Sequence, residues 1–206
     1  GDNKLTVIVA DEQLAGRGRG TRTWYSPAKL NVYVSFCHLV EKDETELSNY
    51  SQLLTISGSE LMQQMGFEVK LKWPNDIYYN KSKLGGILIE NNLRGSKIEH
   101  AIIGIGINVN QLAFDTPVAT SLREITRETF ESNALIEKIL VQLELKYFQL
   151  KSKGIAPLKL EYLRRLYLFN EAHDFEAANG IFRGSITGIS NYGLLQITEN
   201  QIIHEF

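Results

Sequence analysis

Cysteine, proline and long apolar runs are scarce in this chain of 206 residues. Cys37 is the only cysteine, which excludes an internal disulfide and leads us to expect a protein of the reducing cytoplasm. No apolar run approaches the roughly 18 residues that a membrane-spanning helix needs, and no secretory signal opens the chain. The four histidines lack the spacing of metal ligands, so a protein-bound zinc site is not expected.

A large excess of charge of one sign is also missing. The formal net charge is −2, which argues against binding nucleic acid over the whole surface. The hydrophobic content of 43% and the charged content of 22% are typical of a globular protein. The length suits one domain, or one large and one small domain. The chain begins with Gly1 rather than Met, so we expect residues to be missing from its front.

The hydrophobic patterns predict a mixed α+β chain. Strands are expected at 5–11, 31–38, 68–73, 76–79, 85–91 and 98–109. Helices are expected at 47–65, after a charged turn at 41–46, then just after Ser121, at 133–152 and at 157–167. From about residue 171 the pattern changes to short strands broken by turn residues, which is typical of a small β-barrel. We therefore predict a first domain over residues 1–169 and a second over residues 170–206.

A glycine-arginine segment, Gly16 to Arg22, is the most informative stretch of the chain. Its arginines offer planar forks of donors that match phosphate and carboxylate oxygens. Its glycines let backbone amides approach an anion closely. Taken alone, the segment also fits a solvated loop or a disordered RNA-binding tail. It lies between the apolar run Val7–Ala10 and a second strand, so we predict a binding loop that joins two core strands.

Two lysine segments follow. In Lys72-Trp73-Pro74-Asn75-Asp76 the lysine suits a phosphate, and the Asn and Asp oxygens suit Mg²⁺. Taken alone, these five residues favour a polar turn. In the second segment, Lys83 to Glu90, paired glycines begin a strand. Glycines there indicate close approach of a ligand or, with similar weight, a β-bulge.

Ile103 to Asn110 alternates between apolar residues and glycine or asparagine. Because side chains on a strand alternate between faces, one face is apolar and the other is floored by Gly104, Gly106 and Asn108. Such a floor buries little by itself, so either another protein element or a planar ligand covers it. With the arginines and lysines in the same domain, we favour a ligand. Gln13, at the end of the first strand, suits a neutral polar ring such as a urea.

These segments, in this order, resemble biotin protein ligases. The resemblance covers nearly the whole chain and rests on five motifs, namely Gln13–Gly20, Trp24–Pro27, Lys72–Asp76, Lys83–Leu88 and Gly104–Val109. It implies a catalytic domain like that of class II aminoacyl-tRNA synthetases, with a mainly antiparallel sheet packed with helices, followed by a small SH3-like β-barrel. It also implies activation of biotin with ATP and Mg²⁺ to biotinyl-5′-AMP, and transfer of biotin to a lysine of a biotin carboxyl carrier protein.

The resemblance also implies a role for each matching residue. The catalytic residues would be Lys72, Arg19 and Arg17. The biotin-binding residues would be Gln13, Gly16, Arg17, Lys72, Gly85, Gly86 and Gly104. The residues that bind ATP and the adenylate would be Arg17, Arg19, Arg22, Trp24, Asn75, Lys83, Gly106 and Asn108. Asp76 would bind Mg²⁺.

Three departures from the family pattern stand beside the match. A Ser-Thr-Asn segment expected before the first strand is absent, Thr21 stands where many members have glycine, and the chain stops at Phe206 where the barrel usually continues. Rival readings are a lipoate–protein ligase, an RNA-binding module and an inactive truncated domain. No membrane or nucleic-acid partner is expected, although a missing front end leaves a DNA-binding domain open. A monomer and a homodimer fit equally.

Overall fold

The computed structural model describes residues 6–39, 44–94, 97–178 and 180–206. The first strands and helices are β1 Thr6–Val9, β2 Val32–Leu39, α1 Glu44–Gln64, β3 Val69–Lys72, β4 Asp76–Tyr79, β5 Ser82–Arg94 and β6 Lys97–Ile107. They are followed by α2 Leu122–Thr126, α3 Ser132–Lys153 and α4 Ala156–Arg165. In the described part of the chain, no helix is long and apolar enough to cross a membrane.

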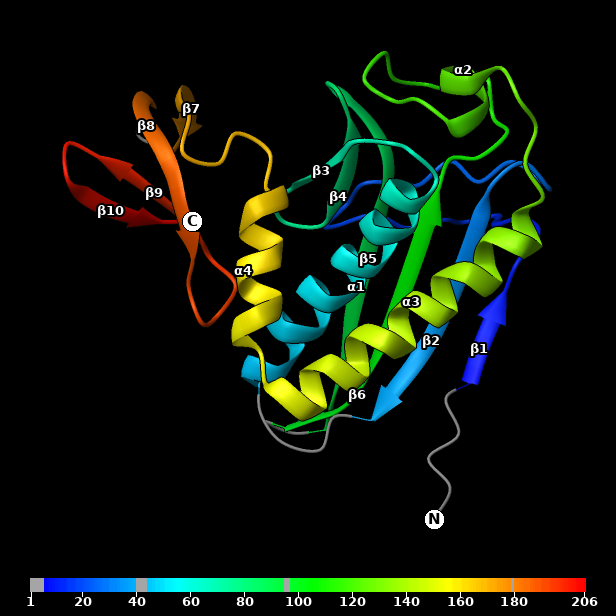
Figure 1. Cartoon of the computed structure of the whole chain (residues 1–206), viewed down its shortest axis with the longest axis horizontal. Helices are drawn as coiled ribbons and strands as arrows, with labels where there is room; N and C mark the ends of the chain where they lie inside the picture. The colour runs from blue at the N-terminus through cyan, green and yellow to red at the C-terminus, as the bar shows by residue number, and fades with distance from the viewer. Residues whose placement is uncertain (1–5, 40–43, 95–96, 179) are drawn as a thin grey trace.

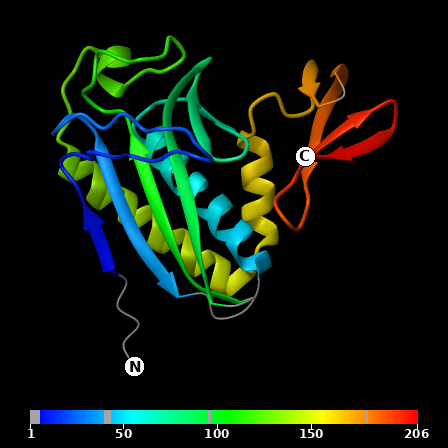
Figure 2. The same cartoon turned by 180° about the vertical axis from the view of Figure 1, so that it is seen from behind.

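Strands β1 to β6 form one antiparallel sheet in the order β1-β2-β6-β5-β4-β3. Helices α1, α3 and α4 cover one face of this sheet, and the long connection from β1 to β2 crosses the other face (Figures 1 and 2). The alternation of β6 explains the two faces. Ile103, Ile105 and Ile107 are buried in the core beneath the helices, while the glycines between them face the opposite side.

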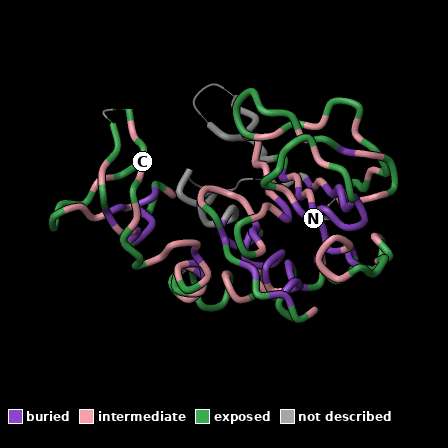
Figure 3. The backbone as a smooth tube through the Cα atoms, turned by 90° about the horizontal axis from the view of Figure 1, so that it is seen from above, coloured by how far each residue is buried: buried purple, intermediate pink, exposed green. Residues whose placement is uncertain are grey.

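Burial follows the same division. The buried segments gather in the interior, and the connecting loops and the C-terminal strands are mostly exposed or partly exposed (Figure 3). A partly buried ionic network stabilises the junction of α1 and α4: the Arg165 guanidinium donates to Glu60 of α1, and also to Glu161 at 2.8 Å. Lys146 of α3 donates to Glu161 at 2.9 Å, which ties in the third helix.

The predicted elements are confirmed within a few residues at each end. Of the charged turn predicted at 41–46, Glu44 and Glu46 instead lie in the first turn of α1, where acidic residues are favourable, and residues 41–43 lie outside the described residues. Helix α4 ends at Arg165, since Leu166 adopts an extended conformation and pairs with Leu71 of β3. The cap at Ser121 is confirmed, because its hydroxyl accepts the backbone N–H of Glu124 at 3.1 Å.

The last strands are β7 Ala172–Ala177, β8 Gly180–Ile189, β9 Leu195–Glu199 and β10 Ile202–Glu205. They form a four-stranded antiparallel sheet in the order β10-β9-β8-β7, which lies beside α4 (Figure 1). One contact joins this sheet to the lysine segment of the larger one: Trp73 Nε1 donates to the carbonyl oxygen of Gly193 at 2.9 Å. The whole chain therefore has a mixed α+β fold of antiparallel sheets and helices.

Candidate active site

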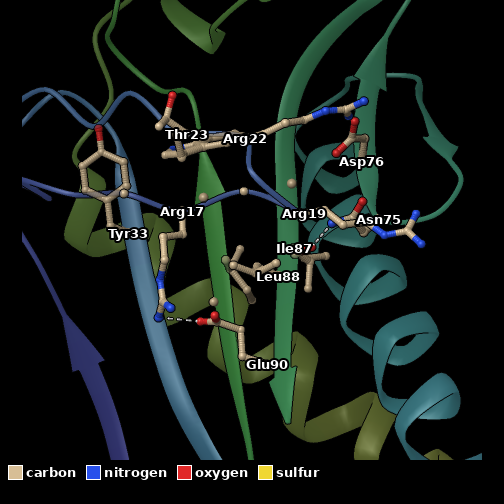
Figure 4. Close-up of a pocket in the computed structure, with 18 of the residues that line it drawn as sticks. Arg17, Arg19, Arg22, Thr23, Tyr33, Asn75, Asp76, Ile87, Leu88 and Glu90 are labelled. Atoms are coloured by element: carbon tan, nitrogen blue, oxygen red, sulfur yellow. Dashed lines mark hydrogen bonds and ion pairs between the residues drawn. The ribbon is translucent and has the colours of Figure 1, made fainter.

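A cavity of about 930 Å³ lies on the sheet face that the helices leave uncovered. Its floor comes from β2, β5 and β6, its roof from the connection after β1, and one wall from the segment that joins β3 to β4. Segments far apart in the sequence thus meet at one place (Figure 4). Five cations and two carboxylates line the cavity, namely Arg17, Arg19, Arg22, Lys72, Lys83, Asp76 and Glu90. This excess of positive charge suits an anionic ligand.

The glycine-arginine segment folds into a small hairpin rather than an irregular loop. Arg17 and Thr23 pair as an antiparallel bridge, and the Gly18 N–H donates to the Arg22 carbonyl at 2.8 Å. Gly20, near the tip, has a φ of 67°, a left-handed conformation that favours glycine. The conformation that demands glycine therefore falls at Gly20, so the threonine at position 21 is compatible with this turn.

The side chains of the three arginines in the hairpin extend to different parts of the cavity. Arg17 Nη2 lies 2.8 Å from Glu90 Oε2 on β5, with the Arg17 side chain 70% exposed. The Arg19 guanidinium lies 5.5 Å from the ring centroid of Trp73, a cation–π arrangement. In the view of Figure 4, Arg19 and Arg22 extend towards the side of the cavity that holds Asp76, and Arg17 extends to the opposite end.

Two lysines contribute to the site in different ways. Lys83 Nζ lies 2.6 Å from Asp76 Oδ1 and 5.1 Å from the Trp24 ring centroid, with its side chain 28% exposed. Lys72 is exposed, and its Nζ lies 4.8 Å from the ring centroid of Tyr78 and donates to the Tyr78 hydroxyl at 3.3 Å. Lys83 is therefore the less exposed of the two cations.

The glycine floor is open at one position and covered at the next. A Cβ added at Gly104 would meet nothing closer than Ser35 Oγ at 3.7 Å. A Cβ at Gly106 would lie 2.8 Å from the Trp24 ring, so the indole packs on that glycine. Trp24 Nε1 is buried and has no hydrogen-bond partner among the described residues. Gly86 also makes room, because a Cβ there would lie 3.2 Å from Asp76 Oδ1.

Two of the predicted ligand contacts do not line the cavity. Gly85 faces away from it, because β5 alternates and Gly86 takes the cavity side. A Cβ at Gly85 would lie 2.8 Å from the Gly106 carbonyl oxygen, which explains the glycine by packing. Asn108 follows the end of β6, and its side-chain amide donates to the Thr120 carbonyl at 3.0 Å. These two residues support the floor from behind and from its end.

Three further predicted residues line the cavity, and contacts within the protein hold each of them in place. Gln13 Oε1 accepts a hydrogen bond from Ser26 Oγ at 2.8 Å, which fixes the amide. Asn75 Nδ2 donates to the Ile87 carbonyl of β5, which ties the wall to the floor. Gly16 is packed closely, since a Cβ there would clash with the carbonyl oxygen of Trp24 at 2.3 Å.

Several residues that line the cavity were not predicted from the sequence, among them Glu90 and Tyr33. The period of two from Gly86 places Glu90 on the cavity face. Tyr33 on β2 lies opposite Gly106, and its hydroxyl donates to the Pro27 carbonyl at 3.2 Å. Burial raises the pKa of Tyr33 above its ordinary value of 10.0, so this hydroxyl stays neutral near pH 7. Its signal was the period of strand β2.

Comparison with known proteins identifies the class of site. The family model for biotin/lipoate A/B protein ligases matches residues 2–108, about half of the chain. The biotin protein ligase from Aquifex aeolicus, solved in complex with biotin and ATP, superposes with a TM-score of 0.81 at 31% identity, covering 97% of this chain and 84% of that one. The fold of this chain is therefore that of the solved biotin protein ligase.

Two curated proteins extend the match. The bifunctional ligase/repressor BirA of Bacillus subtilis is 34% identical over 95% of this chain and 62% of its own length. The biotin–[acetyl-CoA-carboxylase] ligase of Paracoccus denitrificans is 26% identical over 91% of this chain and 82% of its own length. The chain belongs to the biotin/lipoate A/B protein ligase family. It spans about three fifths of the length of the BirA proteins that it matches.

Proposed function

We propose that this protein activates biotin with ATP and transfers the biotinyl group to a lysine of a biotin carboxyl carrier domain. The observation that carries the proposal is the cavity itself, where a glycine-arginine hairpin roofs an open glycine floor beside a partly buried lysine–aspartate pair. A flat neutral ring fits the floor at Gly104, and a phosphate fits the cations at the other end. The biotin ligases of known structure support the choice of biotin.

In the first step an oxygen of the biotin carboxylate attacks the α-phosphorus of ATP. The bond from the α-phosphorus to the bridging oxygen of the β-phosphate breaks, and pyrophosphate leaves with both bonding electrons. In this mechanism the cavity acts by positioning the two anions and stabilising the charge of the transition state, and no protein nucleophile is required.

Lys83 is the better placed of the two lysines for the reacting phosphate. It projects into the cavity between Asp76 and Trp24, whereas Lys72 is exposed and packs against Tyr78. We therefore propose that Lys83 neutralises charge at the α-phosphate, the role that the family resemblance implied for Lys72. Lys72 would supply longer-range attraction for the incoming anions.

The other predicted residues divide between the two halves of the ligand. Gln13 and Gly104 would meet the biotin ring, because the anchored amide and the open floor face the same space. Trp24, Asn75 and Arg22 would contact the adenylate half. In the second step the neutral ε-amine of the acceptor lysine attacks the carbonyl carbon of the mixed anhydride, AMP leaves with both electrons of the broken C–O bond, and the amine proton passes to solvent.

Mg²⁺ would enter with the triphosphate of ATP. In the described part of the chain, no three His, Cys, Asp or Glu side chains are grouped to hold a metal ion, and Asp76 is already paired with Lys83. This fits Mg²⁺, which in nucleotide sites is commonly held by phosphates, water and one or two carboxylates. Asp76 would supply one oxygen, and the metal would neutralise charge on the leaving pyrophosphate.

A division of the chain into two domains is also part of this proposal. We propose residues 1–169 as the catalytic domain, similar to that of class II aminoacyl-tRNA synthetases, and residues 170–206 as an SH3-like β domain. The antiparallel meander from β7 to β10, with Phe182 stacked on Phe206 at 5.7 Å, supports the second. Residence in the cytoplasm and the absence of a nucleic-acid partner stay predictions.

One assay tests the function. Biotin should stimulate exchange of labelled pyrophosphate into ATP, and lipoate should not. The same protein should then attach biotin to an isolated biotin carboxyl carrier domain. Exchange driven by lipoate would transfer the proposal to lipoate ligation, and retention of RNA with neither exchange reaction would favour an RNA-binding module.

A further inference from the structure

Glu90 is a carboxylate in a cavity that should attract anions, and this placement calls for an explanation. The cavity has two carboxylates, each paired with a cation: Asp76 with Lys83 at 2.6 Å, and Glu90 with Arg17 at 2.8 Å. The two pairs lie at different ends. Asp76 is the neighbour of Gly86 on β5, and Glu90 is four residues further along the same strand, about 13 Å away.

The Arg17–Glu90 pair joins the roof of the cavity to its floor. Arg17 lies at the base of the hairpin, where it pairs with Thr23, and its side chain reaches down to β5 (Figure 4). The open floor at Gly104 is nearby, because Gly104 pairs with Leu88, two residues before Glu90 on β5. The ion pair therefore holds the hairpin across the end of the cavity where the biotin ring is proposed to bind.

Arg19 and Arg22 differ from Arg17. Arg19 lies over Trp73, and within the described ranges neither arginine forms an ion pair with a carboxylate. Their charges are thus available to an incoming phosphate. The charge of Arg17 is already balanced by Glu90. Among the three arginines of the hairpin, Arg17 is thus paired with a carboxylate and the other two are not.

We propose that Arg17 and Glu90 form a latch that holds the hairpin closed over the biotin end, while Arg19 and Arg22 contact the phosphate. This rests on the proposed function and makes Glu90 a positioning residue. Partly exposed ion pairs contribute roughly 0.2–1 kcal/mol, which corresponds to about 1.4- to 5-fold in an opening equilibrium. A latch of this strength opens readily for ligand entry and still slows the escape of the adenylate.

The test is a double-mutant cycle with Glu90→Gln, Arg17→Gln and the double variant, together with the charge swap Arg17→Glu/Glu90→Arg. Release of biotinyl-5′-AMP is measured by tryptophan fluorescence after a chase with excess biotin. We expect each single substitution to speed release about 1.4- to 5-fold, the double variant to be no faster than the faster single, and the swap to restore slow release. Single-turnover adenylation should change less than release.

Glu137→Gln, on the exposed surface of α3, is the matched control and should leave the release rate unchanged. Additive effects in the double variant would overturn the latch. So would a Glu90→Gln variant with normal release beside an Arg17→Gln variant with slow adenylation, because Arg17 would then be a ligand of the anion.

A second readout needs no catalysis. Amide hydrogen exchange over residues 16–24 of the ligand-free protein should be faster in Glu90→Gln than in the wild type and in Glu137→Gln. Unchanged exchange would overturn the latch even in an active enzyme. Faster exchange in a protein that forms no adenylate would instead retain the latch and refute the proposed function.

Discussion

The two faces of strand β6 differ in what covers them. On the helix side, Ile103, Ile105 and Ile107 are at most 3% exposed and belong to the main core. On the cavity side, Gly104 is open and Gly106 is covered only by the indole of Trp24. Alternate residues of one strand thus serve two purposes. Substitutions on the helix side should change stability, and those on the cavity side should change ligand binding or rate.

The largest effect is expected from Ile103→Ala on the helix side. It removes a side chain that is 2% exposed in the core and leaves a cavity, which typically costs about 2–5 kcal/mol of the free energy of unfolding. Denaturant unfolding measures the loss, and biotin affinity measured well below the midpoint should stay near that of the wild type. A loss of biotin affinity larger than the loss of stability would contradict the assignment of this face to packing alone.

Lys83→Met tests the cavity side. It keeps the bulk of the side chain next to Trp24 and removes the charge proposed to stabilise the transition state. Single-turnover adenylation should fall by roughly 10²–10³-fold, with a smaller change in biotin affinity. Lys81→Met, in the exposed turn before β5, is the matched control and should adenylate normally. If Lys72→Met were slower than Lys83→Met, the reacting phosphate would belong near Lys72.

Gly104→Val separates the two glycines of the floor. A side chain there meets no close atom in the empty protein, so the unfolding midpoint should barely move, while overpacking against bound biotin should cost roughly 1–3 kcal/mol, or about 5- to 160-fold in affinity. Gly106→Val should instead lose stability as well, because it collides with Trp24. Calorimetric titration with biotin and thermal unfolding of both variants provide the comparison. Equal stability losses in the two variants would show that both glycines are packing sites.

The smallest effect is expected in the pH dependence of stability, through Glu60 of helix α1. Burial alone would raise the pKa of Glu60, but the hydrogen bond and charge of Arg165, with the charge of Lys146, outweigh burial and lower it below 4.5. A lowered pKa contributes stability that is present above pH 4.5 and is lost as the pH falls through the folded-state pKa. Unfolding free energies measured from pH 7 to pH 3 should fall less steeply in Glu60→Gln, and biotin affinity at pH 7 should not change. An identical pH slope in both proteins would contradict this.

Much of the fold was predictable because its signals are local. The capping pair Ser121 and Glu124, the helix end at Gly154 and the alternation of β6 are each written within a few residues. Element ends are less predictable: α4 ends at Arg165 rather than at about residue 167, because Leu166 pairs with Leu71, a tertiary contact that a helical pattern does not reveal.

The order of the motifs and the residue types that they bring to the site can be predicted from the sequence. Which side chains share the cavity depends on the folded arrangement. Period two on β5 assigns Gly86 and Glu90 to one face, but their ion-pair partners come from distant segments. Lys83 meets Asp76 across a strand pair, and Glu90 on the floor meets Arg17 of the roof. Charge pairing depends on distances in space, which strand order and register set.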